Sequence, residues 1–198
     1  MSYPAAFAEY AKSPVLRRLR ECKLWVAEAR REESSVGKPG IAIDIPGFGR
    51  RVIRTVISDY TGTLSRRGKL SPGVNARLRR LLRLVDLEII TADSYGTAGS
   101  QLKGIVVPHM LQRKRHDVEK RDFARRFGLR HVAAFGNGNN DQLMLKAVKE
   151  GGGIAVAVDN GEGCAVDALV HANIFVVGAA NALDLLLNPT ACKATLRF

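Results

Sequence analysis

Two aspartates stand where a largely apolar run gives way to a polar loop that contains glycine. Asp59 follows residues 52–57 and opens the segment Asp-Tyr-Thr-Gly-Thr-Leu. Asp141 closes the segment Gly-Asn-Gly-Asn-Asn-Asp, which follows residues 132–135. A carboxylate at the end of a buried strand can bind a divalent cation or attack phosphorus. For either aspartate alone, an ordinary turn or helix-capping residue is the simpler interpretation.

Thr91 and Lys120 are two further residues that could contact a phosphate group. Thr91 follows a short strand pattern at 87–90, and its hydroxyl could donate to a phosphate oxygen or cap the next helix. Lys120 is expected in the first turn of a helix capped by Asp117, where its charge opposes the helix dipole. A bound phosphate would remove this conflict, because helix N-termini stabilise anions. A solvated surface lysine is the alternative.

Alternating strands and helices are expected to position these residues. Strands are predicted at 51–58, 87–90, 104–107, 131–135, 154–158 and 174–177, and helices at 72–85, 94–102, 117–127, 140–149, 164–171 and 181–187. This alternation predicts an α/β fold with a parallel sheet and helices on both faces. A β-hairpin, with a strand at 41–45 and a turn at 46–49, is expected before the sheet. Ligands of such folds bind beyond the carboxyl ends of the strands, which is where the four residues above are expected.

The first forty residues differ from the rest of the chain. An amphipathic helix is predicted from Pro14 to about Arg31, and residues 34–40 have the composition of a linker. The sequence therefore predicts two parts: an N-terminal helical extension with its linker at 1–40, and an α/β domain at 41–198 that contains the four candidate residues.

Composition limits the partners that can be considered. The chain of 198 residues has a net charge of +12, which favours anionic partners but is also compatible with a merely soluble surface. Nucleic acid is one such partner, but only 6% of the residues are aromatic and no aromatic-rich basic motif supports it. The sequence shows no apolar run of bilayer length and no secretory signal, so we expect no membrane contact and a cytoplasmic protein. The three cysteines are widely spaced and are expected to be reduced.

The four motifs together carry a family resemblance. Asp59 to Leu64, then Thr91, then Lys120, then Gly136 to Asp141 occur in one order, each at an expected strand end or helix start. In this they resemble the haloacid dehalogenase (HAD) superfamily, and most closely its small soluble P-type-ATPase-like members. The resemblance covers residues 41–198 and implies a Rossmann-like core and a hydrolase that acts on phosphoric ester or anhydride bonds.

The resemblance also implies a role for each residue of the motifs. Asp59 would be the nucleophile that forms an aspartyl-phosphate, and Lys120 would hold the phosphoryl oxygens together with Thr91. Mg²⁺ would be the cofactor, held by Asp59, the backbone carbonyl of Thr61, and Asp141. The remaining residues expected around the phosphate are Gly62, Thr63 and Asn137. The partner would be an anionic phosphorylated substrate.

Three departures from the usual pattern affect these expectations. Most HAD phosphatases have a second aspartate where this chain has Thr61, and a general acid is typically worth about 10²–10⁴-fold in rate. Turnover is therefore expected to be slow, and a regulatory phosphate- or Mg²⁺-binding module with little turnover is the alternative function. Asn137 replaces an aspartate of many relatives, which should weaken Mg²⁺ binding. The short segments 64–71 and 91–120 leave no room for a cap domain, so the site should be open or closed by another subunit of a homo-oligomer.

Overall fold

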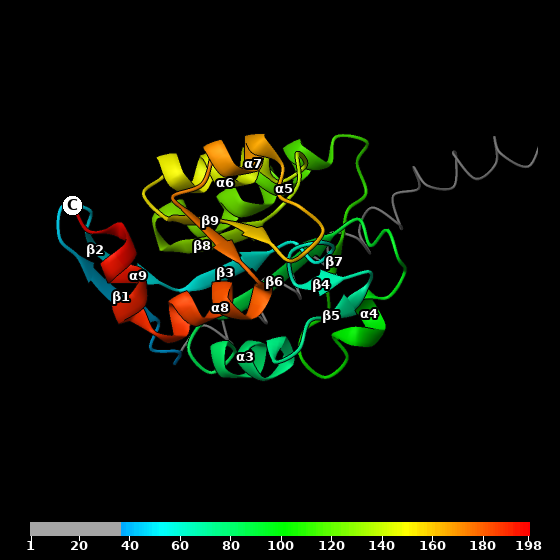
Figure 1. Cartoon of the computed structure of the whole chain (residues 1–198), viewed down its shortest axis with the longest axis horizontal. Helices are drawn as coiled ribbons and strands as arrows, with labels where there is room; N and C mark the ends of the chain where they lie inside the picture. The colour runs from blue at the N-terminus through cyan, green and yellow to red at the C-terminus, as the bar shows by residue number, and fades with distance from the viewer. Residues whose placement is uncertain (1–36) are drawn as a thin grey trace, which may run out of the picture. The chain divides into compact units, whose positions relative to one another are not determined.

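The computed structural model describes residues 37–198 (Figure 1). The predicted N-terminal helix lies outside the described residues. Lys38–Phe198 forms one compact unit. Its first residue is anchored, because the Lys38 ammonium lies 2.8 Å from Asp86 Oδ1 and 3.1 Å from the carbonyl oxygen of Val85.

A six-stranded parallel sheet forms the centre of this unit, with the strand order β10-β9-β8-β3-β6-β7. The strands are β3 (Thr55–Ser58), β6 (Asp86–Thr91), β7 (His109–Met110), β8 (Val132–Gly136), β9 (Ile154–Asp159) and β10 (Ile174–Val177). β3, β8 and almost all of β9 are buried, as expected for strands covered on both faces. The predicted α/β fold is therefore confirmed.

Helices cover both faces of the sheet (Figure 1). One layer consists of α5 (His116–Ala124), α6 (Gln142–Glu150) and α7 (Val166–Val170), and the other of α3 (Val74–Leu81) and α8 (Ala179–Leu187). Each layer buries its own apolar cluster, which contains Phe123 and Met144 on the first face and Leu78 and Leu183 on the second. No helix within residues 37–198 is long and apolar enough to cross a membrane.

Two small hairpins flank the sheet. β1 (Ile41–Ile45) pairs antiparallel with β2 (Gly49–Ile53) as predicted, and buries its isoleucines against α9 (Pro189–Leu196). β4 (Ser65–Arg66) and β5 (Lys69–Leu70) pair just after Asp59, where the sequence predicted only a loop. The turn between them has positive φ at Arg67 and Gly68, as in the tight turns that connect antiparallel strands.

Several predicted elements differ from the structure. The strand expected at 104–107 is wrong: Gly104 has φ 73°, residues 105 and 106 pack on the core as a loop, and the strand that pairs with β6 is β7. The helix expected at 94–102 is only α4 (Ala98–Gln101). The helix expected at 117–127 ends as α-helix at Ala124 and continues as the 3₁₀ turn Arg125–Phe127, while the 3₁₀ turn Leu129–His131 and α9 were not predicted. Among the described cysteines, Cys164 and Cys192 are free thiols, while Cys22 lies outside the described residues.

Candidate active site

Asp59 occupies the first position beyond β3. Its backbone N–H donates to the carbonyl oxygen of Phe135 at 2.9 Å, so the ladder with β8 fixes the backbone up to this residue. Only 4% of the residue is exposed, and Oδ1 accepts a hydrogen bond of 2.6 Å from Lys120 Nζ. The sheet therefore presents a buried, charge-paired carboxylate at its carboxyl edge.

Lys120 bridges two carboxylates. The residue is fully buried, and its ammonium lies 2.6 Å from Asp59 Oδ1 and 2.6 Å from Asp141 Oδ1. The alternative of a solvated surface lysine is therefore wrong. The placement in the first helical turn is also wrong, because α5 begins at His116 and Lys120 is its fifth residue. Its environment comes from the two carboxylates rather than from the helix dipole.

Asp141 reaches this lysine from the start of α6. Its Oδ2 accepts the backbone N–H groups of Asn137 at 3.0 Å and Gly138 at 2.9 Å, and its Oδ1 is left for Lys120. The preceding strand must end in a glycine, because a Cβ at Gly136 would lie 2.5 Å from Asp141 Cβ. The asparagine–glycine loop thus serves to orient one carboxylate.

Thr63, Gly62 and Asn137 close the opposite side of Asp59. The Thr63 hydroxyl lies 3.3 Å from Asp59 Oδ2 and 3.1 Å from Asn137 Oδ1. Gly62 has φ 78°, and a Cβ there would lie 2.4 Å from Asn137 Nδ2. Asn137 also donates to the carbonyl oxygen of Gly163 at 3.3 Å, which ties this side of the site to the loop after β9.

Thr91 and Thr61 lie at the same edge with different surroundings. Thr91 ends β6 next to β3, is fully buried, and accepts the Asp93 N–H at 2.9 Å. It does not cap the next helix, because the N–H groups at the start of α4 donate to the Asp93 carboxylate. Within residues 37–198 it makes no hydrogen bond to Asp59, Lys120 or Asp141. The Thr61 hydroxyl is buried and finds no hydrogen-bond partner among the described residues.

Tyr60 and Glu119 are structural contributors that the sequence reasoning missed. The Tyr60 hydroxyl donates to the carbonyl oxygen of Gly68 at 2.8 Å and so holds the β4–β5 hairpin over the site. The Glu119 carboxylate accepts the N–H groups of Gln112 and Arg113, which fixes the loop before α5. Both residues are adjacent in sequence to a motif residue, but sequence spacing gives no indication of contacts to a loop backbone.

Burial and charge pairing shift the pKa of two members of the trio Asp59, Lys120 and Asp141. Burial, reinforced by the neighbouring Asp141 charge, raises the pKa of Asp59 to about 6 even though Lys120 opposes the shift. Burial acts to lower the pKa of Lys120, but the two carboxylates outweigh it and the pKa is raised. Near neutral pH Asp59 is therefore mainly a carboxylate, and it lies against the Lys120 ammonium.

This arrangement fits a small hard cation. Within the described part of the chain, no group of three or more histidine, cysteine or acidic side chains is arranged to hold a metal. Asp59 and Asp141 supply two carboxylates with a residual negative charge, and the backbone carbonyl of Thr61 is the third predicted ligand. Mg²⁺ commonly binds proteins through one or two carboxylates, and its other positions are filled by water and substrate phosphate.

Known structures with the same arrangement of strands and helices identify the fold. The cobalt-bound deoxy-D-mannose-octulosonate 8-phosphate phosphatase from Haemophilus influenzae aligns over 74% of this chain and 94% of its own, with a TM-score of 0.55 and 12% identity. A protein assigned to HAD subfamily III A from Legionella pneumophila aligns over 73% and 87%, with a TM-score of 0.53 and 18% identity. The fold is that of the HAD superfamily. A protein assigned as a 3-deoxy-D-manno-octulosonate 8-phosphate phosphatase from Vibrio cholerae shares this HAD fold over 79% of this chain and 98% of its own, with a TM-score of 0.52 and 15% identity.

Sequence comparison adds one relative. An uncharacterized protein of Methanocaldococcus jannaschii is 41% identical over 66 residues, which are 33% of this chain and 67% of the archaeal protein. The chain belongs to the same family as that protein. No family model matches the sequence.

Proposed function

We propose that this protein is a Mg²⁺-dependent phosphohydrolase or phosphotransferase that works through an aspartyl-phosphate on Asp59. The observation that carries the proposal is the buried trio, in which Lys120 bridges Asp59 and Asp141 at the carboxyl edge of a HAD-fold sheet. Burial of three charged groups costs free energy of folding, because each ion must be removed from water. Such perturbed ionisable groups are concentrated at functional sites.

The two oxygens of Asp59 have different tasks in this proposal. Oδ1 is held by Lys120, whereas Oδ2 receives the long 3.3 Å hydrogen bond from Thr63 and is the oxygen that would attack. Attack by Oδ2 forms a bond to phosphorus, and the bond from phosphorus to the leaving oxygen breaks with its electron pair on that oxygen. Water then attacks the same phosphorus, the bond to Oδ2 breaks, and inorganic phosphate leaves.

Neighbouring residues would hold the reacting groups in place. Lys120 would keep Asp59 ionised and receive part of the negative charge that develops on the phosphoryl oxygens. Thr63, Asn137 and Thr91 would supply polar groups near the phosphate. Bound Mg²⁺, held by Asp59, Asp141 and the Thr61 carbonyl, would neutralise phosphate charge that otherwise repels the carboxylates.

Thr61 supports a second candidate function. No carboxylate occupies the position from which most HAD phosphatases protonate the leaving group, and the Thr61 hydroxyl has no described partner. The leaving oxygen must then take its proton from water, which slows poor leaving groups. A phosphate- or Mg²⁺-binding regulatory module with little turnover, like an isolated P-type ATPase phosphorylation domain, is therefore the alternative.

The substrate is proposed to be an anionic phosphorylated molecule. Two of the structural neighbours are named for phosphatase action on a phosphorylated sugar acid, which agrees with this class. Segments 64–71 and 91–120 hold only the β4–β5 hairpin, α4, β7 and the start of α5, so no inserted domain limits the size of the substrate. Nucleic-acid binding and a homo-oligomer remain predictions without further support.

Hydrolysis of p-nitrophenyl phosphate, with and without Mg²⁺, tests the proposal. We expect activity that chelation of the metal removes, and a loss of at least about a thousandfold in Asp59→Asn. Asp44→Asn, at an exposed position on β1, makes the same chemical change away from the site and should keep full activity. Full activity of a folded Asp59→Asn protein would exclude the mechanism. The alternative function predicts Mg²⁺-dependent transfer to Asp59 without repeated turnover.

A further inference from the structure

A groove lies beside the candidate active site at the same edge of the sheet. Its volume is about 520 Å³. The lining residues are Arg66, Lys69, Leu70, Ser71, Pro72, Asn160, Gly178, Ala179 and Ala180. One wall is the β4–β5 hairpin, and the other is formed by the residues that follow β9 and β10, including the start of α8.

The two walls are joined by one buried side chain. Asn160, only 9% exposed, donates to Ser71 Oγ at 2.8 Å and accepts the Ala179 N–H at 3.2 Å. Ser71 follows the hairpin, and Ala179 is the first residue of α8. The fold therefore fixes the groove, because these two hydrogen bonds connect its walls.

The lining is positively charged. Arg66 and Lys69 project from the hairpin, and within residues 37–198 neither forms an ion pair. No acidic side chain is among the lining residues, and the nearby Asp159 and Glu162 carboxylates accept backbone N–H groups. Asn160 takes the Ala179 N–H, and the N–H groups that follow it in the first turn of α8 favour an anion.

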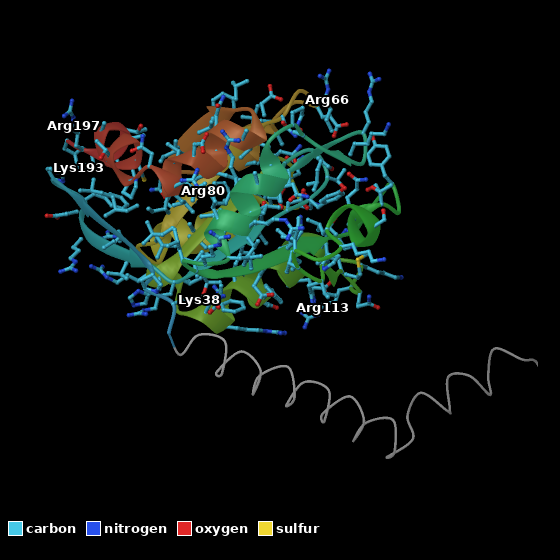
Figure 2. All side chains as sticks on the ribbon, turned by 90° about the horizontal axis from the view of Figure 1, so that it is seen from below. Lys38, Arg66, Arg80, Arg113, Lys193 and Arg197 are labelled. Carbon is cyan, nitrogen blue, oxygen red and sulfur yellow. The ribbon has the colours of Figure 1, made fainter. Side chains whose placement is uncertain are left out.

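The second basic segment before α5 is different. Arg113 pairs with Asp122 at 3.1 Å, and Arg115 pairs with Asp117 at 2.7 Å. Figure 2 shows Arg66 and Arg113 well apart on the molecule. Both arginines of this segment are thus paired, whereas Arg66 and Lys69 of the hairpin are left for a ligand.

Contacts connect the groove to the reacting groups. Arg66 lies against Gly161, where a Cβ would be 3.2 Å from its guanidinium carbon, and the same loop receives the Asn137 side chain at Gly163. The groove lies beyond β9 and β10, which are two and three strands from β3. At the usual strand spacing it lies roughly 10–14 Å from the Asp59 position.

We propose that this groove binds a second anionic group of the substrate, roughly 10–14 Å from the phosphate that reacts at Asp59. The inference rests on the proposed function and adds to it the substrate class, which is a phosphorylated molecule with an additional phosphate or carboxylate at its far end. Arg66 and Lys69 are then residues that determine specificity.

A series of alkanediol bisphosphates tests both the charge and the span. The kcat/KM of ethanediol, hexanediol and dodecanediol bisphosphate is compared with that of the corresponding alkyl monophosphates in Mg²⁺. We expect the largest advantage for the hexanediol compound, whose extended span falls in the stated range. The advantage should be about tenfold, as expected for a few exposed charge contacts, and should shrink as salt is added.

Two matched variants locate the effect. Arg66→Gln with Lys69→Gln should remove the bisphosphate advantage mainly through KM. Lys193→Gln with Arg197→Gln makes the same change of charge at the opposite end of the molecule and should keep it (Figure 2). An absent advantage in the wild-type protein, or an equal loss in both variants, would overturn the inference.

A binding measurement separates this inference from the proposed function. If no phosphoester, including p-nitrophenyl phosphate, is turned over, the proposed function fails. Calorimetric titration with hexanediol bisphosphate then still tests the groove. Binding that is lost in the Arg66/Lys69 variant and kept in the Lys193/Arg197 variant would support an anion site, and absence of binding by the wild-type protein would overturn it.

Discussion

At the scale of residues, the central feature is one buried ammonium between two buried carboxylates. Lys120 satisfies both Asp59 and Asp141, so loss of either aspartate still leaves the lysine paired. Loss of the lysine would leave two carboxylates facing each other without a cation. The three residues therefore contribute unequally to stability, although all three are proposed to serve the same reaction.

Removal of the ammonium should destabilise the fold far more than removal of the nucleophile. We expect Lys120→Met to lower the free energy of unfolding by about 3–5 kcal/mol, since it leaves buried charge uncompensated. Asp59→Asn should not destabilise, because burial raises the pKa of Asp59 to about 6 and the charged form is disfavoured in the fold. Urea denaturation without metal measures both.

The same experiment has a pH signature. The folded state holds the Asp59 proton up to a higher pH than the unfolded state does. The contribution of Asp59 to the free energy of unfolding therefore falls as pH rises from about 4 to 6. This decline should be absent in Asp59→Asn. Lys146→Met, at an exposed position on α6, is the control for the lysine change and should stay within about 0.5 kcal/mol. Equal effects of the two lysine variants would contradict the buried trio.

Thr61 gives a prediction about the leaving group. Thr61→Asp should restore a general acid and raise kcat for alkyl phosphates more than for p-nitrophenyl phosphate, because a good leaving group needs little protonation. The gain for alkyl phosphates should be about tenfold or more. The control Thr61→Asn introduces a side chain with nearly the shape of aspartate but no carboxylic acid, so it should give no such gain. A parallel response of both substrates would count against this role of position 61.

At the scale of elements, strand ends and the loops behind them fix the site. β3 delivers Asp59, β8 ends at a glycine that makes room for Asp141, and α5 brings Lys120 across to both. The hairpin β4–β5, tied down by Tyr60, stands over this edge. Substitutions that reduce the space next to the backbone at these strand ends should therefore alter metal binding and activity.

Gly136→Ala tests this dependence on backbone space. Its Cβ would meet Asp141 Cβ and Cγ at 2.5 Å, so the carboxylate must move. We expect Mg²⁺ affinity to fall by about 10–100-fold, the usual effect of disturbing a residue that orients a ligand. Gly99→Ala, where a Cβ has open space, is the control and should leave metal affinity unchanged. Unchanged affinity in Gly136→Ala would show that Asp141 is not a ligand.

The elements also show what the sequence could and could not predict. The buried strands could be predicted from the sequence, because continuous apolar runs such as residues 154–158 are typical of parallel sheets. The apolar residues 105 and 106 were misassigned because they pack on the core as a loop, and periodicity cannot separate that from a short strand. The four motifs located the residues at the sheet edge. The burial of Lys120 and the groove depend on contacts between distant segments, which a single sequence does not encode locally.

At the scale of the whole molecule, the described chain is one compact unit, Lys38–Phe198, with a net positive charge on the full sequence. Lys193 and Arg197 lie at one end of the unit, far from both Arg66 and Arg113, which lie on different sides of it (Figure 2). The unit begins with anchored residues, because Lys38 contacts Asp86 and the Gly40 N–H donates to the carbonyl oxygen of Leu84 at 2.9 Å.

Truncation tests whether this unit is independent. A protein that lacks residues 1–37 should unfold cooperatively and keep its Mg²⁺ affinity and its activity. A protein that lacks residues 1–40 loses the Lys38 and Gly40 contacts and should be less stable by about 1–2 kcal/mol. Failure of the shorter deletion to fold would show that residues 1–37 are part of the core.

The central claim is that Asp59 itself becomes phosphorylated. Its most direct test is acid quenching of the protein, at times from milliseconds to minutes, after mixing with radiolabelled acetyl phosphate and Mg²⁺. We predict an acid-stable label on the wild-type protein that hydroxylamine removes, as expected for an acyl phosphate, and no label on folded Asp59→Asn. A wild-type protein that never carries label, or an Asp59→Asn protein that does, would contradict the account.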